Sequence, residues 1–357
     1  MLNRISFIFF ILINIFNIWA CAPALLKFDV DTPAQTLTYL GEPPISDERP
    51  QFREIFCGLI NENSAAQHRQ IKCEDYLWRL NDEKRGDRLR QPLPANDTNL
   101  RIILVPGAFS ECFPEMGKPY QDAAARLKEL GYRIDTIVVS GRSSSKYNAS
   151  IIAKTVDGLD LKPTERLILL GYSKGTTDIL HFLVGYPDIA KKVTAVLSVA
   201  GVINGTPIAD KFADIYANWF KKISIEECEP GDGGVLESLK RSFQFSWMAA
   251  NPLPQNVRYF SIVTFTNREN VQAGLLLTYD LLRNIDPRND GQVIFYDQVI
   301  PGSSLLAYIN LDHWAIAVPV KEKTASHAWE VASNHPLVRD MFFEAMILFL
   351  AEKLAFR

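Results

Sequence analysis

From residue 101 onward, short apolar runs alternate with amphipathic stretches. The apolar runs are rich in residues that favour strands, and they cover 101–105, 134–139, 165–170 and 193–200. The stretches between them have helical spacing and cover 120–132, 148–159 and 176–186. This alternation predicts βαβ units, and therefore an α/β fold with a mostly parallel sheet covered by helices on both faces.

Residues 23–99 follow a different pattern. They are rich in proline and polar residues, are weakly periodic, and contain the charged run DEKRGDR at 82–88. These features are typical of surface loops. We therefore expect a loop-rich N-terminal extension over 21–99 and one main domain over 100–357.

The charge of the chain narrows the class of ligand. The net charge is −3 over 357 residues, with neither a basic stripe nor an acidic tail. This balance gives no electrostatic basis for nucleic-acid binding. A small polar or apolar substrate fits the composition better.

The first residues are typical of an export signal. Arg4 is followed by a mostly apolar segment of about 15 residues, which is the length of a signal-peptide hydrophobic region and short for a membrane span. The residues IWAC at 18–21 resemble the bacterial lipobox, which predicts a signal peptide over 1–20 and a lipid on Cys21. Such a lipoprotein would lie at a membrane surface in the periplasm or cell envelope. Plain secretion and an uncleaved anchor are the alternatives.

Export also bears on the other four cysteines, because an oxidising compartment favours disulfides. We expect Cys57 to pair with Cys73, since the two are close in sequence, and Cys112 to pair with Cys228. Buried free thiols are the alternative, above all for the second pair.

The pentad GYSKG at 171–175 lies where an apolar strand run turns into a helical stretch. This is the context of the G-x-S-x-G nucleophile elbow. The turn is strained, and glycines at both ends leave room for a serine hydroxyl above the sheet. Ser173 is therefore the candidate nucleophile; a Gly-rich turn with a capping serine is the alternative.

A nucleophilic serine needs a base, which in this arrangement follows it in the chain. His313 follows the strand-like run SLLAYIN, in the loop LDHWAIA, and is the predicted base. His68 precedes the serine, and His181 lies on the same predicted helix. His327 and His335 come later and have the pattern of polar surface residues.

The acid that orients this base is less sharply defined by the residues. Asp290 lies in the turn NDGQV at 289–293, which resembles the aspartate loop of bacterial lipases, and is the predicted acid. Glu269 and Asp286 are the main competitors; Asp280 and Asp297 rank below them.

Two backbone N–H groups are needed to stabilise the oxyanion, and the loss of one such donor typically costs about 10²- to 10³-fold in rate. One is expected from Lys174, the residue after the nucleophile. The second is expected from Ala108 in the loop VPGAF at 105–109, after the first strand run.

The segment from about 100 to 357 resembles the α/β-hydrolases, in particular bacterial lipases and esterases. The resemblance rests on the GYSKG elbow and on SVAGVINGTPIAD at 198–210, which is similar to the lipase stretch that leads into a cap. Pro106 departs from the family, in which this loop often reads HG.

The resemblance implies a cap over the site, inserted at about 206–255. An apolar stripe with helical spacing begins this region and comprises Phe212, Ile215, Tyr216, Trp219, Phe220 and Ile223. In a lipase this stripe would face the acyl chain or a lipid surface. A helix packed on the domain core is the alternative.

We therefore expect a serine hydrolase of carboxylic esters, acting on medium or long acyl chains without a cofactor. A polyester depolymerase, a phospholipase or a thioesterase would share every residue named above. A non-catalytic, membrane-tethered binding protein is the remaining alternative, because a fold does not determine a function.

Overall fold

A seven-stranded parallel sheet is the centre of the computed structural model, which describes residues 44–80, 83, 99–112, 118–211, 229–319 and 328–355. The strand order is β1-β7-β6-β5-β4-β2-β3, and every neighbouring pair is parallel. The strands are β1 (Ser46–Asp47), β2 (Leu100–Val105), β3 (Arg133–Thr136), β4 (Arg166–Tyr172), β5 (Val193–Val199), β6 (Arg258–Thr264) and β7 (Ser304–Ile309). The predicted α/β fold is confirmed.

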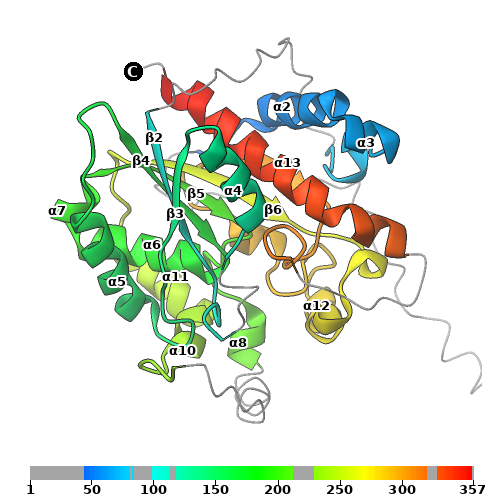
Figure 1. Ribbon diagram of the computed structural model, residues 1–357. Coiled ribbons are helices and arrows are strands. Elements are labelled where there is room, and N and C mark those ends of the chain that lie inside the picture. Colours follow the sequence, from blue (N-terminus) through cyan, green and yellow to red (C-terminus); the bar gives the residue numbers. More distant parts are fainter. Residues whose placement is uncertain are drawn as a thin grey trace, which may run out of the picture.

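Helices lie on both faces of this sheet (Figure 1). One face carries α2 (Arg49–Glu62), α4 (Gln121–Glu129) and α13 (Ala328–Ala355), and the other carries α5 (Ser145–Asp157) and α6 (Lys174–Gly185). The further described helices are α3 (Ser64–His68), α7 (Pro187–Ala190), α8 (Pro207–Lys211), α10 (Val235–Leu239), α11 (Arg241–Ala250) and α12 (Leu276–Arg283).

The inner strands β2, β4, β5, β6 and β7 are mostly apolar because both of their faces are buried, whereas the edge strands β1 and β3 are largely exposed. In β2, Ile102 and Leu104 belong to the core cluster with α2, α4 and α13, whereas Ile103 and Val105 belong to the cluster with α5 and α6. Successive side chains of a strand point to opposite faces, so a strand between two helical layers needs apolar residues at every position.

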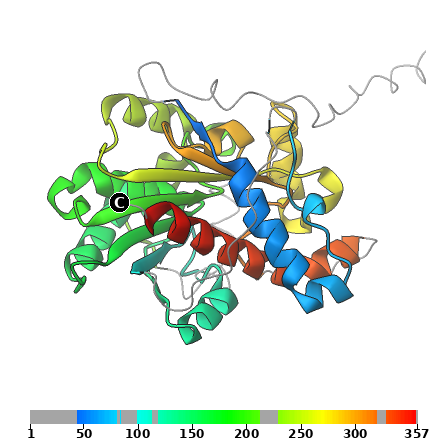
Figure 2. The same cartoon turned by 90° about the horizontal axis from the view of Figure 1, so that it is seen from above.

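Helix α2 shows that the expected loop-rich extension is wrong for residues 49–62. Phe52, Ile55, Phe56, Leu59 and Ile60 follow helical spacing and are buried. The ring of Phe56 stacks on that of Phe342 in α13 at a centroid distance of 3.9 Å, and Figure 2 shows α2 crossing close to α13. The apolar period was present in the sequence, but it is short and lies between proline-rich and charged segments that have the composition of loops.

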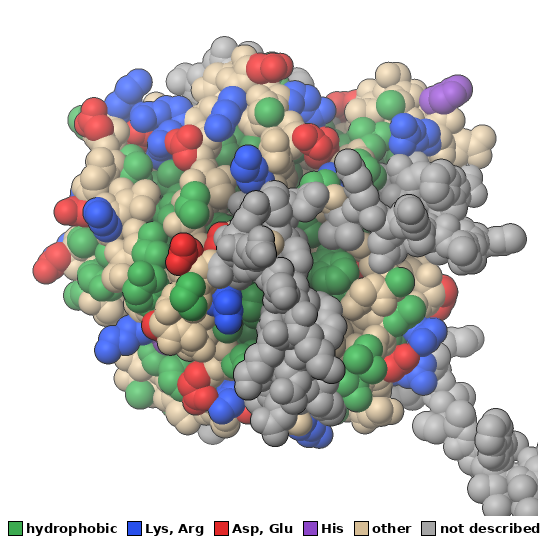
Figure 3. Space-filling view, turned by 60° about the horizontal axis from the view of Figure 1, so that its bottom comes forward, with side chains coloured by type: hydrophobic (Ala, Val, Ile, Leu, Met, Phe, Trp, Pro, Cys, Tyr) green, Lys and Arg blue, Asp and Glu red, His purple; other side chains and the backbone are tan. Residues whose placement is uncertain are grey.

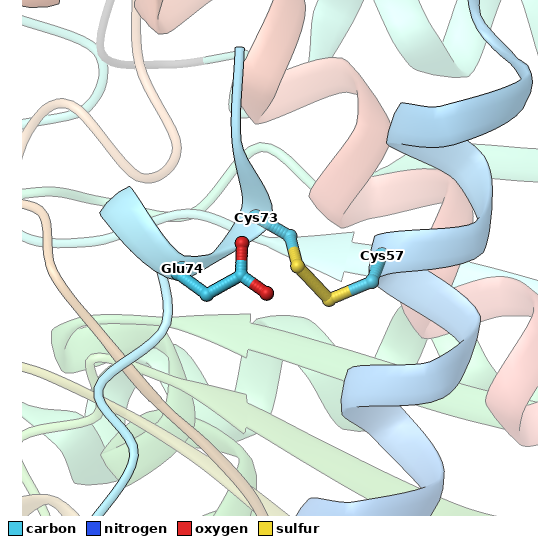
Figure 4. Close-up of side chains that lie close together, drawn as sticks. All are labelled: Cys57, Cys73 and Glu74. Atoms are coloured by element: carbon cyan, nitrogen blue, oxygen red, sulfur yellow. A yellow bond between two sulfur atoms is a disulfide. The ribbon is translucent and has the colours of Figure 1, made fainter.

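Two further contacts hold this N-terminal segment on the domain. Strand β1 pairs with β7 at one edge of the sheet. Cys57 of α2 is bonded to Cys73 in the 3₁₀ turn η3 (Cys73–Asp75), as expected, with the Cα atoms 5.1 Å apart. Glu74 lies beside the disulfide (Figure 4), and the two sulfurs, being bonded to each other, are not available as thiolate ligands for a metal.

Several other predictions fall outside the described residues. Cys112 is disulfide-bonded, but Cys228 is outside them, so the second predicted pairing stays a prediction. The signal peptide over 1–20, Cys21 and the apolar stripe from Phe212 to Ile223 are outside them as well. In the described part of 206–255 the chain forms α8, α10 and α11.

Among the helices in the described ranges, none combines the length and the apolar character needed to cross a membrane.

Candidate active site

Ser173 lies in the sharp turn between β4 and α6. Its backbone has φ 55° and ψ −130°, a conformation that is strained for a residue with a side chain. The two glycines of the pentad make this turn possible: a Cβ on Gly171 would lie 2.5 Å from the Cα of Thr176, and one on Gly175 would collide with the carbonyl oxygen of Val105. The pentad therefore has the backbone geometry of a nucleophile elbow.

His313 reaches Ser173 from the loop that follows β7. Its Nε2 lies 2.8 Å from the Ser173 Oγ, and the residue is 4% exposed. The Tyr172 hydroxyl donates to the backbone carbonyl of His313 at 2.7 Å, which fixes this loop on the end of β4.

Asp290 lies on the other side of the imidazole. Its Oδ2 is 2.8 Å from His313 Nδ1 and also accepts a hydrogen bond from the Thr264 hydroxyl at 2.6 Å. Its Oδ1 accepts the backbone N–H groups of Gln292 and Val293 at 2.9 and 2.8 Å. These donors hold a fully buried carboxylate in one orientation toward the histidine.

Among the described residues, none of the competing acids is hydrogen-bonded to His313. Glu269 is exposed, in the 3₁₀ turn η4 (Arg268–Asn270), and Asp286 forms an ion pair with Arg288 at 2.8 Å. Asp280 pairs with Arg268, and Asp297 lies 3.1 Å from Arg241. Of the five carboxylates considered, the structure brings Asp290 to His313.

The other histidines lie elsewhere. His68 is exposed at the end of α3. His181 stacks on Trp247 with ring centroids 3.8 Å apart, and burial lowers the pKa of His181 to about 3. His327 and the side chain of His335 lie outside the described residues.

Two backbone segments converge on Ser173, and each carries an expected oxyanion donor. Lys174 begins α6, and Ala108 lies in the loop after β2. Within the described residues, no hydrogen-bond acceptor receives the N–H of either residue. The loop approaches closely, since a Cβ on Gly107 would lie 2.9 Å from the Cβ of Ser173. The N–H of Phe109 is unavailable, because it donates to the carbonyl of Gly141 at 2.9 Å.

Two features of the site were not expected from the sequence. The side chain of Lys174 is buried and forms an ion pair with Asp178, with the Nζ 2.5 Å from the Oδ1. The sequence had indicated a role only for the backbone N–H of this residue. Asp312, next to His313, accepts the N–H groups of Gln272 and Ala315 at 2.7 and 2.8 Å. Burial raises the pKa of Asp312 to about 6. The i, i+4 spacing of Lys174 and Asp178 could have indicated their ion pair. No local pattern in the sequence indicated the burial of Asp312.

The molecular surface agrees with the weak net charge. Figure 3 shows Lys and Arg side chains interspersed with Asp and Glu on one face, with apolar side chains between them. On the described part of that face, charges of one sign do not form a continuous patch.

Comparison with solved structures identifies similar folds. The metagenomic carboxyl esterase MGS0156 matches with a TM-score of 0.79 and 34% sequence identity, over 93% of this chain and 98% of that one. The mature lipase BlEst2 of Bacillus licheniformis matches with a TM-score of 0.50 and 21% identity, over 64% of this chain and 89% of that one, and supports the fold alone. No family model matches the chain, and a search of curated proteins gives no match.

Proposed function

The chain belongs to the α/β-hydrolase family, with a carboxyl esterase among its relatives, and on this premise we propose that it is a serine hydrolase of carboxylic esters. One observation carries the proposal: His313 lies 2.8 Å from both the Ser173 Oγ and the Asp290 carboxylate. A serine, a base and a buried acid in this order are the groups that acyl transfer requires.

The proposed reaction begins at the serine hydroxyl. His313 Nε2 takes the proton from Ser173 as its oxygen attacks the ester carbonyl carbon. Asp290 accepts a hydrogen bond from the Nδ1–H of His313, which holds the tautomer with an unprotonated Nε2 and stabilises the imidazolium that forms.

The tetrahedral intermediate carries a negative charge on the former carbonyl oxygen. The N–H groups of Ala108 and Lys174 are the proposed donors to this oxyanion, because neither has an acceptor among the described residues and both border the nucleophile. His313 then returns the proton to the leaving alkoxide. Water, activated by the same histidine, releases the acid from the acyl-enzyme.

The proposal for the substrate names only a chemical class. A small ester or lipid fits the family, and a preference for medium or long acyl chains rests on the apolar stripe from Phe212 to Ile223. Rates on a series of synthetic esters of increasing acyl length would test that preference. The same assay, extended to polyesters, phospholipids and thioesters, would separate the related activities.

The location of the protein is proposed from the N-terminal residues alone. We propose that the chain is exported and held at a membrane surface through a lipid on Cys21. Metabolic labelling with a radioactive fatty acid should mark the wild type and not the Cys21→Ser variant. Equal labelling of both would contradict the anchor.

A fluorophosphonate tests the proposed chemistry directly. It should label Ser173 in the purified protein, as shown by mass spectrometry of the modified peptide, and should not label Ser173→Ala. His313→Ala should slow labelling by several orders of magnitude. A wild-type protein that hydrolyses esters without an adduct on Ser173 would overturn the mechanism.

A further inference from the structure

A buried polar chain begins at the side chain of Lys174. The Lys174 Nζ lies 2.5 Å from the Asp178 Oδ1, and both side chains are 1% exposed. The Asp178 Oδ2 accepts a hydrogen bond from the Asn148 Nδ2 at 2.7 Å. The first residue of α6, whose backbone N–H is one proposed oxyanion donor, is therefore linked to α5.

Asn148 continues the chain to the loop after β3. Its Nδ2 also donates to the carbonyl of Ser140 at 2.9 Å, and its Oδ1 accepts the N–H of Ser140 at 3.1 Å. Asn148 is buried, and its amide uses both donor hydrogens and an acceptor in these three bonds. One side chain thus fixes Ser140 from both of its backbone groups.

The loop at Ser140 in turn holds the segment that carries Ala108. The carbonyl of Gly141 accepts the N–H of Phe109 at 2.9 Å, and the N–H of Gly141 donates to the carboxylate of Glu111. The backbones are so close that a Cβ on Gly141 would lie 2.5 Å from the N and the Cα of Phe109. A displacement of Ser140 would therefore be transmitted to the residues that follow Ala108.

We propose that Asn148 is a positioning residue that keeps the two oxyanion donors, the N–H groups of Ala108 and Lys174, in register with Ser173. The inference rests on the proposed function. It follows from the sequence of polar contacts described above. These contacts link Lys174 to Ser140 through Asp178 and Asn148, and Gly141 to the loop that carries Ala108. A buried ion pair by itself is weak evidence for a stabilising role. This pair includes Lys174, which is adjacent to the nucleophile, and its position therefore favours a role at the site.

The test separates the rate of each active site from the number of active sites. Endpoint titration with a fluorophosphonate counts reactive Ser173, and kcat is expressed per titrated site. Asn148→Leu should lower this kcat by about 10- to 10²-fold with KM within a factor of about three, because misplaced donors weaken the transition state more than the bound ester. The affinity for a trifluoromethyl ketone, which forms an oxyanion on Ser173, should fall in the same proportion.

Asn63→Ala is the matched control for a loss of stability. Asn63 caps α3 by accepting the N–H of Ala66 at 3.0 Å, in the N-terminal segment and outside the polar chain. This variant should lose stability and keep the wild-type kcat per site. A purely structural Asn148 would give the same result, with fewer titrated sites of normal rate, and would overturn the proposal.

A second pair of variants covers the case in which Asn148→Leu does not fold. Both carry Lys174→Met, so that no charge is left unpaired, and they differ only at position 178. Both variants lose the Lys174 side chain alike, so their ratio tests the link from Asp178 to Asn148. Asp178→Asn keeps an acceptor for Asn148, and its kcat per site should be about 10-fold or more above that of Asp178→Leu, which removes the acceptor. Equal rates would overturn the inference. Failure of Ser173 to react in the wild type would instead overturn the proposed function.

Discussion

Asp290 holds His313 by two separate bonds. The carboxylate Oδ2 lies 2.8 Å from the imidazole Nδ1, and the backbone carbonyl of Asp290 accepts the N–H of His313 at 2.9 Å. The first bond determines the tautomer of the ring, and the second holds the loop that carries it. Because the second uses only backbone atoms, the side-chain bond can be removed while the loop stays in place.

Asp290→Asn should therefore lower kcat without unfolding the protein. An amide cannot stabilise the imidazolium and offers an N–H where the ring needs an acceptor, so we expect a loss of about 10³- to 10⁴-fold. Steady-state kinetics and a thermal unfolding curve would measure both effects. Asp286→Asn, which affects an ion pair with Arg288 away from the imidazole, should retain kcat. Near-wild-type activity of Asp290→Asn would exclude this carboxylate as the triad acid.

Gly107→Ala should damage the nucleophile from outside the elbow. The added Cβ would lie 2.9 Å from the Cβ and 3.3 Å from the Oγ of Ser173, so either the serine or the oxyanion loop must shift. We expect kcat/KM to fall by about 10²-fold. Gly185→Ala in α6 is the control, since nothing lies within 4 Å of its Cβ position. It should keep the activity and gain up to about 1 kcal/mol in the free energy of unfolding.

Removal of the disulfide between Cys57 and Cys73 should destabilise the domain. The bond closes a loop with a sequence separation of 16, and a loop of this size contributes about 3 kcal/mol by restricting the unfolded chain. Urea unfolding of the Cys57→Ser/Cys73→Ser variant should show this loss, with kcat per active site unchanged. A change below about 1 kcal/mol would mean that the N-terminal segment is held by its packing alone.

Asp297 should make the stability depend on pH. Burial raises the pKa of Asp297 from 3.8 to about 7, despite the nearby Arg241. The folded protein thus holds this proton more tightly than the unfolded chain. The resulting stabilisation is complete below about pH 4 and is lost as the pH rises through about 7.

Asp297→Asn removes this titration. The free energy of unfolding of the variant, relative to the wild type, should therefore rise by roughly 2 kcal/mol between pH 5 and pH 8. Urea unfolding at the two pH values measures the difference. Asp188→Asn is the control, because the pKa of Asp188 is lowered by Lys191 and lies below this range in both states. A difference between Asp297→Asn and wild type that does not change with pH would contradict the prediction.

The parts of the fold that could be predicted are those with a local cause. Strand β4 needs apolar residues on both faces, and the turn after it needs small residues at Gly171 and Gly175, so both left a pattern in neighbouring positions. Helix α2 did not stand out, because its partner α13 is about 280 residues away in the sequence and its own apolar period is short.

In the site, too, some features have a local cause in the sequence and others depend on contacts between distant segments. The sequence pointed to Ser173, His313 and Asp290, and the structure brings the three together. The choice of Asp290 over Glu269 or Asp286 depends on which carboxylate the tertiary structure turns toward the histidine. The role proposed for Asn148 could not be predicted, because its bond to Asp178 joins two helices and the loop at Ser140 contacts Phe109 only through the tertiary fold.

The pairing of β1 with β7, and of α2 with α13, sets the order in which this protein can be completed. A ribosome makes the β1 and α2 segments before the chain that forms β7 and α13. The apolar face of α2 must therefore remain without this partner until the chain through α13 has been made. Contacts between such distant segments slow folding and prolong the exposure of apolar surface. The packing of α2 is thus completed late, by a helix that is made about 280 residues after it.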